Sequence, residues 1–272
     1  KVVKNALRDF RLSGAELEGD ARERFREIVS ELSTLSNRFD QNLLDATDHW
    51  FLDIEDENDL QGLPQSAIDL AHKTAKDASV SGWRFSLQAP SYIPFMMFCE
   101  NRALREKVYE AYVTRASDVG PDARQFDNGP LMVQILSLRA EMASLLGFAH
   151  YAQYALEGRM AGSAQEVGEF LRTLAECAKD AATKELDELR SFALAEYGEK
   201  DLAAWDIAFY SEKLKQSLYA FSDEEIRPYF PLPKVLEGLF FVTEKLFGVK
   251  VQKAVCASVW HEDVQFFQLL ND

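Results

Sequence analysis

The sequence contains few cysteines and no long apolar run. Three cysteines, Cys99, Cys177 and Cys256, are spread over 272 residues without a C-x-x-C pair. A sparse, odd set of this kind is typical of a reducing compartment, where cysteine behaves as a small core residue, so we expect a cytoplasmic protein. A membrane-spanning helix needs about 20 consecutive apolar residues. The candidate run from Leu236 to Val242 is much shorter and contains Glu237, so we expect no membrane partner.

Positive charge is also scarce. The chain has 30 Lys and Arg against 45 Asp and Glu, which gives a formal net charge of −15. Binding to phosphates needs a basic face, so we expect no nucleic-acid partner. A hydrophobic fraction of 47% with 28% charged residues is typical of a folded globular chain and excludes a disordered tail. At about 150 residues per domain, the length allows one large domain or two ordinary ones.

Motifs of the common catalytic sites are missing. The chain contains no G-x-S-x-G elbow, no P-loop and no G-x-G-x-x-G. A zinc peptidase of the H-E-x-x-H type needs two imidazoles on one helical face and a carboxylate that activates water. His261-Glu262 begins this motif, but Gln265 occupies the place of the second ligand. We therefore predict that His261 is not a metal ligand.

The other histidines do not complete a metal site either. Asp69-Leu-Ala-His72 resembles half of a di-iron pattern, which needs a second copy that the chain lacks. We interpret it as the solvated face of a short helix, and we expect His49 and His150 to be surface or capping residues. The acidic run from Asp53 to Asp59 lacks the glycine of a calcium loop. From the residues alone we predict no catalytic and no metal-binding position, and the substrate-binding residues stay unknown.

Helical periodicity dominates what is present. Apolar residues spaced 3 or 4 apart form one stripe, for which Asp20 is the expected N-cap: Phe25, Ile28, Leu32, Leu35, Phe39 and Leu43. Capping boxes begin at Ser163 and Ser222. Further helices are expected over residues 64–78, 102–116, 128–147, 163–198 and 233–248.

Three stretches depart from this helical period. Residues 45–62 are expected to form an irregular connection, and Trp83 to Leu87 alternates like an edge strand or a packed loop. From Val249 to Leu270, β-branched and aromatic residues at short spacing predict strand. The predicted fold class is therefore mainly α, a multi-helix array with a little β near the C-terminal end.

Several sequence blocks, taken in order, resemble one protein family. The blocks are Leu12-Ser-Gly-Ala-Glu-Leu17, Phe39-Asp-Gln-Asn-Leu-Leu-Asp-Ala-Thr47, Gly62-Leu-Pro64, Pro90-Ser-Tyr92, Ala111-Tyr-Val-Thr-Arg-Ala-Ser-Asp118, Asp127-Asn-Gly-Pro130, Leu138-Arg-Ala-Glu141, Leu145-Leu-Gly-Phe148, Met160-Ala161, Trp205-Asp-Ile-Ala-Phe-Tyr-Ser-Glu212, Tyr229-Phe-Pro231 and Trp260-His-Glu-Asp-Val264. The chain resembles the thimet oligopeptidase family of M3-type zinc metallopeptidases, and in particular its bacterial oligopeptidase A branch. The resemblance runs from about Arg8 to the last residue.

This resemblance implies a helical clam-shell enzyme with two domains on either side of a deep channel that admits short peptides. In the family, H-E-x-x-H and a downstream Glu hold zinc, and a later His/Tyr loop stabilises the oxyanion. All of these residues follow the block that matches Trp260, so none has a counterpart here. The resemblance implies that residues 1–248 form an N-terminally incomplete channel-wall domain. Residues 249–272 would then begin a truncated catalytic domain.

The function implied is that of a portion of a zinc-dependent oligopeptidase that hydrolyses internal bonds of short peptides. Zinc would be the cofactor of the parent protein, with none expected in this chain, which we expect to be inactive alone. A stand-alone, non-catalytic helical peptide-binding module is the alternative, and a purely structural helical scaffold is a third. Trp205 and Asp206 could line the channel, but a helix N-terminus with a buried tryptophan is the favoured interpretation.

Both ends of the chain look cut. Residue 1 is Lys1 rather than Met, and the chain stops at Asn271-Asp272 directly after an apolar run. We expect the parent to be a monomer. In this chain, the predicted strand from Val264 to Leu270 would lack its hairpin partner, and an unpaired apolar strand invites pairing with another chain. We therefore expect either a dimer through that edge or disorder of the last residues.

Overall fold

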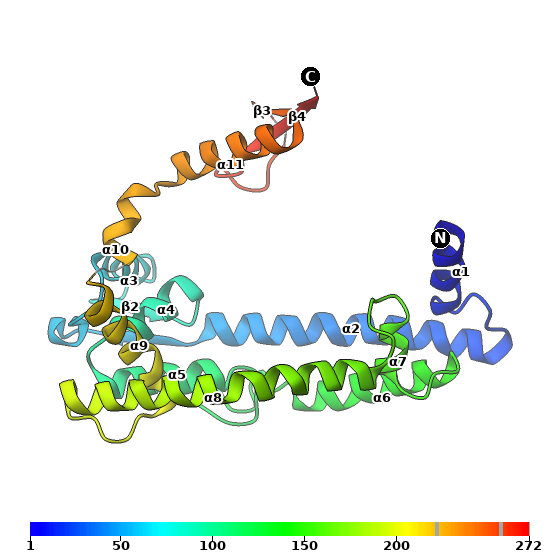
Figure 1. The fold of residues 1–272 in the computed structure, drawn as a ribbon, viewed down its shortest axis with the longest axis horizontal. Coiled ribbons are helices and arrows are strands. Elements are labelled where there is room, and N and C mark those ends of the chain that lie inside the picture. The colour runs from blue at the N-terminus through cyan, green and yellow to red at the C-terminus, as the bar shows by residue number, and fades with distance from the viewer. Residues whose placement is uncertain (221–222, 256–257, 272) are drawn as a thin grey trace. The chain divides into compact units, whose positions relative to one another are not determined.

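The computed structural model describes residues 1–220, 223–255 and 258–271 (Figure 1). The chain divides into two compact units, Lys1–Leu214 and Lys215–Asp272. Helices dominate both units, and the sheets of the described residues are two antiparallel pairs of strands. The predicted fold class, mainly α with a little β near the C-terminal end, is confirmed. No helix in the described ranges is long and apolar enough to cross a membrane.

The predicted apolar stripe forms one core of the first unit. It lies on α2 (Gly19–His49), which follows α1 (Val2–Leu12) and packs beside α6 (Gly129–Leu145) (Figure 1). Buried side chains from the two long helices meet here: Phe25, Ile28, Leu35, Leu131, Ile135, Leu138 and Met142. The expected N-cap is wrong, because α2 begins at Gly19 with Glu18 as its N-cap, and Asp20 lies in its first turn.

A second core of the first unit surrounds a small sheet. Its elements are β1 (Phe51–Ile54), the 3-10 helix η1 (Glu57–Leu60), α3 (Gln65–Asp77), β2 (Trp83–Ser86), α4 (Ala89–Phe98) and α5 (Arg102–Val113). β1 pairs antiparallel with β2, with Ile54 opposite Trp83. The irregular connection predicted for residues 45–62 is therefore wrong in part. Leu52 and Ile54 alternate into the core, while Asp53 on the other face binds Arg84 at 2.7 Å.

The long helix α8 (Ala164–Tyr197) begins and ends where its signals predict. The hydroxyl of Ser163 accepts a hydrogen bond from the Glu166 N–H at 3.0 Å, and Gly198 ends the helix with a φ of +69°. Its last turns pack against α9 (Ala204–Tyr219), and α7 (Tyr151–Leu156) precedes it.

α5 ends three residues before the predicted Ala116, whose φ of +52° is incompatible with a helix.

The second unit combines short helices with a hairpin. It contains α10 (Asp223–Ile226), η2 (Arg227–Tyr229), α11 (Leu232–Phe247), β3 (Val249–Ala254) and β4 (Phe266–Asn271). The capping box expected at residue 222 begins outside the described residues. β3 pairs with β4 over its whole length, from Val249 opposite Asn271 to Ala254 opposite Phe266. The expectation that the last strand lacks a hairpin partner is therefore wrong, whereas dimerisation stays a prediction.

Candidate functional site

The four histidines lie in separate places. His49 ends α2, 3.9 Å from the Asp122 carboxylate, and His72 is exposed on α3. His150 caps α7, its Nδ1 accepting a hydrogen bond from the Gln153 N–H at 3.2 Å, as predicted for a capping residue. Among the described residues, no group of three or more His, Cys, Asp or Glu could hold a metal ion. The described histidines, cysteines and carboxylates therefore do not provide a ligand set that fits the zinc implied by the family resemblance.

Among the described residues, the contacts of His261 are local ones. Its Nδ1 accepts a hydrogen bond from the Asp263 N–H at 3.2 Å and lies 3.6 Å from that residue's carboxylate. The imidazole is 61% exposed and the carboxylate 89% exposed. These contacts describe a solvated turn, and an exposed pair of this kind contributes little to stability.

A buried cluster of charges joins α5 to α9. Asp206, in the first turn of α9, is completely buried, and its carboxylate accepts hydrogen bonds from both Arg102 and Arg105. The Arg102 Nη2 donates at 2.7 Å and the Arg105 Nη2 at 2.8 Å. The backbone N–H of Ala203 donates to the same carboxylate at 3.0 Å, so Asp206 also caps its own helix.

The buried guanidinium of Arg105 is fully engaged. Its side chain is 1% exposed, its Nη1 donates to the Cys99 carbonyl at 2.7 Å, and its Cζ lies 4.0 Å from the centre of the Phe209 ring. A buried charge needs partners of this kind, because burying an unpaired charge would cost several kcal/mol of folding free energy.

The same contacts decide the ionisation of Asp206. Burial raises the pKa of its carboxyl, but the hydrogen bonds from Arg102, the Ala203 N–H and Arg105 outweigh it and hold that pKa below its usual range. A carboxylate held ionised by two arginines is a poor general acid or base at neutral pH. We interpret this cluster as a structural clamp between helices far apart in the sequence.

Trp205 belongs to the surroundings of this clamp. Its ring packs against the second core, with its centroid 6.1 Å from that of Tyr109 and 5.9 Å from the Arg102 guanidinium. Its Nε1 is buried and has no hydrogen-bond partner among the described residues. Trp205 and Asp206 lie in the first turn of α9, as the favoured interpretation predicted, but Trp205 is half-buried rather than buried. No motif in the sequence marks Arg102 and Arg105 as members of this cluster.

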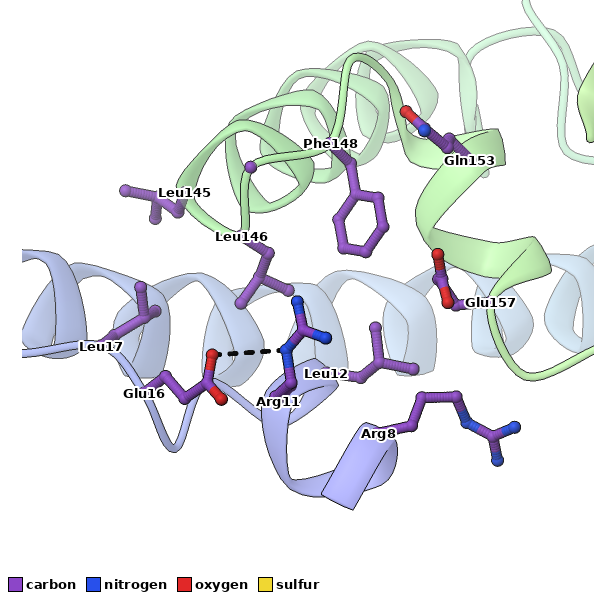
Figure 2. Close-up of a pocket in the computed structure, with 11 residues that line it drawn as sticks. Arg8, Arg11, Leu12, Glu16, Leu17, Leu145, Leu146, Phe148, Gln153 and Glu157 are labelled. Atoms are coloured by element: carbon purple, nitrogen blue, oxygen red, sulfur yellow. Dashed lines mark ion pairs between the residues drawn. The ribbon is translucent and has the colours of Figure 1, made fainter. Parts of the chain in front are cut away.

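A cavity of about 470 Å³ lies where α1 approaches the connection between α6 and α7. Figure 2 shows Leu146 and Phe148 pointing towards Arg11 and Leu12 on α1. Apolar and polar side chains line it together: Leu12, Leu17, Leu145, Leu146 and Phe148 are apolar, Arg8, Arg11, Glu16 and Glu157 are charged, and Gln153 is polar. Its volume is within the range of small-molecule sites. The lining residues include no histidine or cysteine.

Comparison with known proteins gives these features a family context. The model of Peptidase family M3 matches residues 95–272. Oligopeptidase A of Haemophilus influenzae (strain ATCC 51907 / DSM 11121 / KW20 / Rd) is 48% identical over 272 residues, which are all of this chain and 40% of that protein. Oligopeptidase A of Escherichia coli (strain K12) is 47% identical over the same shares. A probable cytosolic oligopeptidase A of Arabidopsis thaliana is 41% identical, over 98% of this chain and 39% of that protein. The chain thus spans about two fifths of the length of these curated relatives.

Proposed function

Because the chain belongs to peptidase family M3, we propose that it is the helical portion of a zinc-dependent oligopeptidase that hydrolyses internal bonds of short peptides. The observation that carries this proposal is the identity of 47–48% with proteins named oligopeptidase A over all 272 residues. Those relatives extend well beyond the share that this chain covers. In our proposal, the zinc ligands and the catalytic base lie in that further part, and these 272 residues alone hydrolyse nothing.

The proposed role of this portion is to form one wall of the channel that admits the peptide. Residues 1–248 would supply the wall, and residues 249–272 would begin the catalytic domain. Long helices such as α2 and α8, of 31 and 34 residues, suit an extended wall. The second compact unit begins earlier, at Lys215, and therefore includes α11 with the hairpin. We place the parent protein in the cytoplasm as a monomer, in keeping with the sparse cysteines.

The alternative is a stand-alone peptide-binding module without catalysis. The cavity beside α1 favours it, because its lining combines apolar side chains with charges of both signs, which suit a short zwitterionic chain. This candidate requires peptide binding by the 272 residues themselves.

A comparison of two purified proteins tests both candidates. The full-length product of the gene and the 272-residue chain would be assayed for zinc content and for cleavage of a quenched fluorescent peptide. We expect one zinc per chain and chelator-sensitive cleavage for the full-length protein only. Chelator-sensitive cleavage by the pure 272-residue chain would overturn the first proposal. Calorimetric binding of short peptides by this chain, with no cleavage by the full-length product, would favour the alternative.

A further inference from the structure

Helix α11 carries apolar side chains on two different faces. One face packs within the second unit, where the ring of Phe240 lies 4.7 Å from that of Phe267 on β4. The other, which we name the open face, is a stripe with spacings of 3, 4, 3 and 4: Leu232, Val235, Leu239, Val242 and Leu246. These five side chains are 67%, 45%, 56%, 51% and 71% exposed.

A stripe of this kind is unusual on a surface that meets only water. A helix at the boundary of a core needs one apolar face, whereas a helix with apolar residues on several sides is normally buried. α11 has only 16 residues, a length at which a helix gains most of its stability from packing. Contiguous exposed apolar patches mark interaction sites more often than they mark plain surface.

We propose that the open face of α11 docks against the part of the full-length peptidase that lies outside these 272 residues, through an apolar surface of that part. This inference rests on the proposed function. The H. influenzae relative extends over a further 100 − 40 = 60% of its length, enough polypeptide to cover the face. The family match runs from residue 95 to 272 and so includes α11 and the hairpin packed against it.

A second copy of the chain fits the open face less well. Each copy carries a formal net charge of −15, so two copies repel each other at long range. The stripe also covers only two heptads, which is short for a helix pair that must stand alone in water.

The test compares the same substitutions in the full-length protein and in the 272-residue chain, with the melting temperature as the readout. We expect Leu239→Asp to lower the Tm of the full-length protein by about 5 °C or more, since it places a charge in a packed interface. In the 272-residue chain it should shift the Tm by less than about 1 °C, because the side chain is already exposed there.

Two further variants serve as controls. Phe241→Asp makes the same kind of change at an apolar residue that is 60% exposed but lies off the open face, beside Lys245. It should leave both proteins within about 1 °C of wild type. Phe240→Ala removes a contact inside the second unit and should lower the Tm of both proteins.

Each other outcome would overturn the proposal. An equal loss from Leu239→Asp in both proteins would show that the face is covered within the 272 residues. If Leu239→Asp lowered the Tm of neither protein, the open face would be exposed to solvent in both. A dimer of the 272-residue chain that Leu239→Asp dissociates, seen by light scattering, would assign the face to a second copy. Because the readout is stability, full-length protein without peptidase activity would refute the proposed function and leave this result standing.

Discussion

Removing the carboxylate of Asp206 is the sharpest test of how the first unit is held together. Asp206→Ala leaves Arg105, at 1% exposure, as a buried charge without its anionic partner. Breaking a buried pair by deleting one member costs about 3–5 kcal/mol. Arg105 keeps its hydrogen bonds to the carbonyls of Cys99 and Glu100, at 2.7 and 3.3 Å. We therefore expect a loss near the lower limit, about 3 kcal/mol.

Arg102→Ala is the matched control for this variant. The Arg102 side chain is 42% exposed, and deleting it leaves Asp206 still paired with Arg105. A pair with an exposed member contributes about 1 kcal/mol or less. Asp206→Ala and Arg102→Ala remove opposite partners of the same hydrogen bond, which is 2.7 Å long. We expect the loss of unfolding free energy to be about three times larger for Asp206→Ala.

Urea unfolding at pH 7, followed by tryptophan fluorescence, measures both costs. Trp50, Trp83 and Trp205 belong to the second core or pack against it, whereas Trp260 in the second unit is already 85% exposed, so the change in signal on unfolding comes mainly from the first unit. With a denaturant dependence of about 3 kcal/mol per molar, Asp206→Ala should move the midpoint down by about 1 M. If its midpoint fell by no more than that of Arg102→Ala, the buried charge would not be what holds α9 to α5.

The same pair of proteins has an expected pH dependence. The folded pKa of Asp206 lies below the ordinary 3.8. Its ionised form therefore stabilises the fold fully above about pH 4, and this contribution is lost as the pH falls through the folded pKa. The difference between wild type and Asp206→Ala should be constant from pH 5 to 7 and narrow below about pH 4. A difference that narrowed already at pH 6 would contradict this assignment.

Two further predictions concern backbone conformation and thiol reactivity. Gly62→Ala should destabilise the chain more than Gly198→Ala in the same urea assay, by about 1 kcal/mol or more. Both glycines have positive φ, but only at Gly62 would the added Cβ collide with the Phe98 carbonyl oxygen; equal costs would refute the steric argument. An aromatic disulfide reagent at pH 8, with sites mapped by mass spectrometry, should modify the exposed Cys177 and leave Cys99 unmodified. Burial raises the pKa of Cys99 to about 11, so comparable labelling rates would contradict the buried environment.

Local signals predicted the helices well. The end of α8 at Gly198 needs only a residue that tolerates a left-handed conformation, and its start needs only a side-chain acceptor at Ser163. The family predicted from the ordered sequence blocks is also confirmed. β1 was missed because its alternation covers only four residues, among them the acidic Asp53. Its partner β2 lies about 30 residues further along the chain. In a chain that is 47% hydrophobic, an apolar alternation of only four residues is hard to recognise as a strand.

The buried clamp and the cavity were beyond the reach of sequence reasoning for a related reason. Arg105 and Asp206 are 101 residues apart, and the hydroxyl of Tyr154 approaches the Leu12 carbonyl across 142 residues. Neither pairing has a periodicity or a spacing that a single sequence displays. Arginine in the first turn of a helix is ordinarily a surface residue, so nothing local marks Arg105 as buried. The absence of a complete catalytic motif, in contrast, can be read directly from residue order.

The separation in sequence between Arg105 and Asp206 also creates a delay while the chain is being synthesised. A ribosome adds roughly 5–20 residues per second, so Asp206 is made about 5–20 s after Arg105, given the 101 residues between them. During that interval α5 carries an arginine destined for the interior without the carboxylate that neutralises it. The pocket around Arg105 can close only once α9 has left the exit tunnel. Until then the nascent chain holds its second core open at that point, available to whatever binds unfinished proteins.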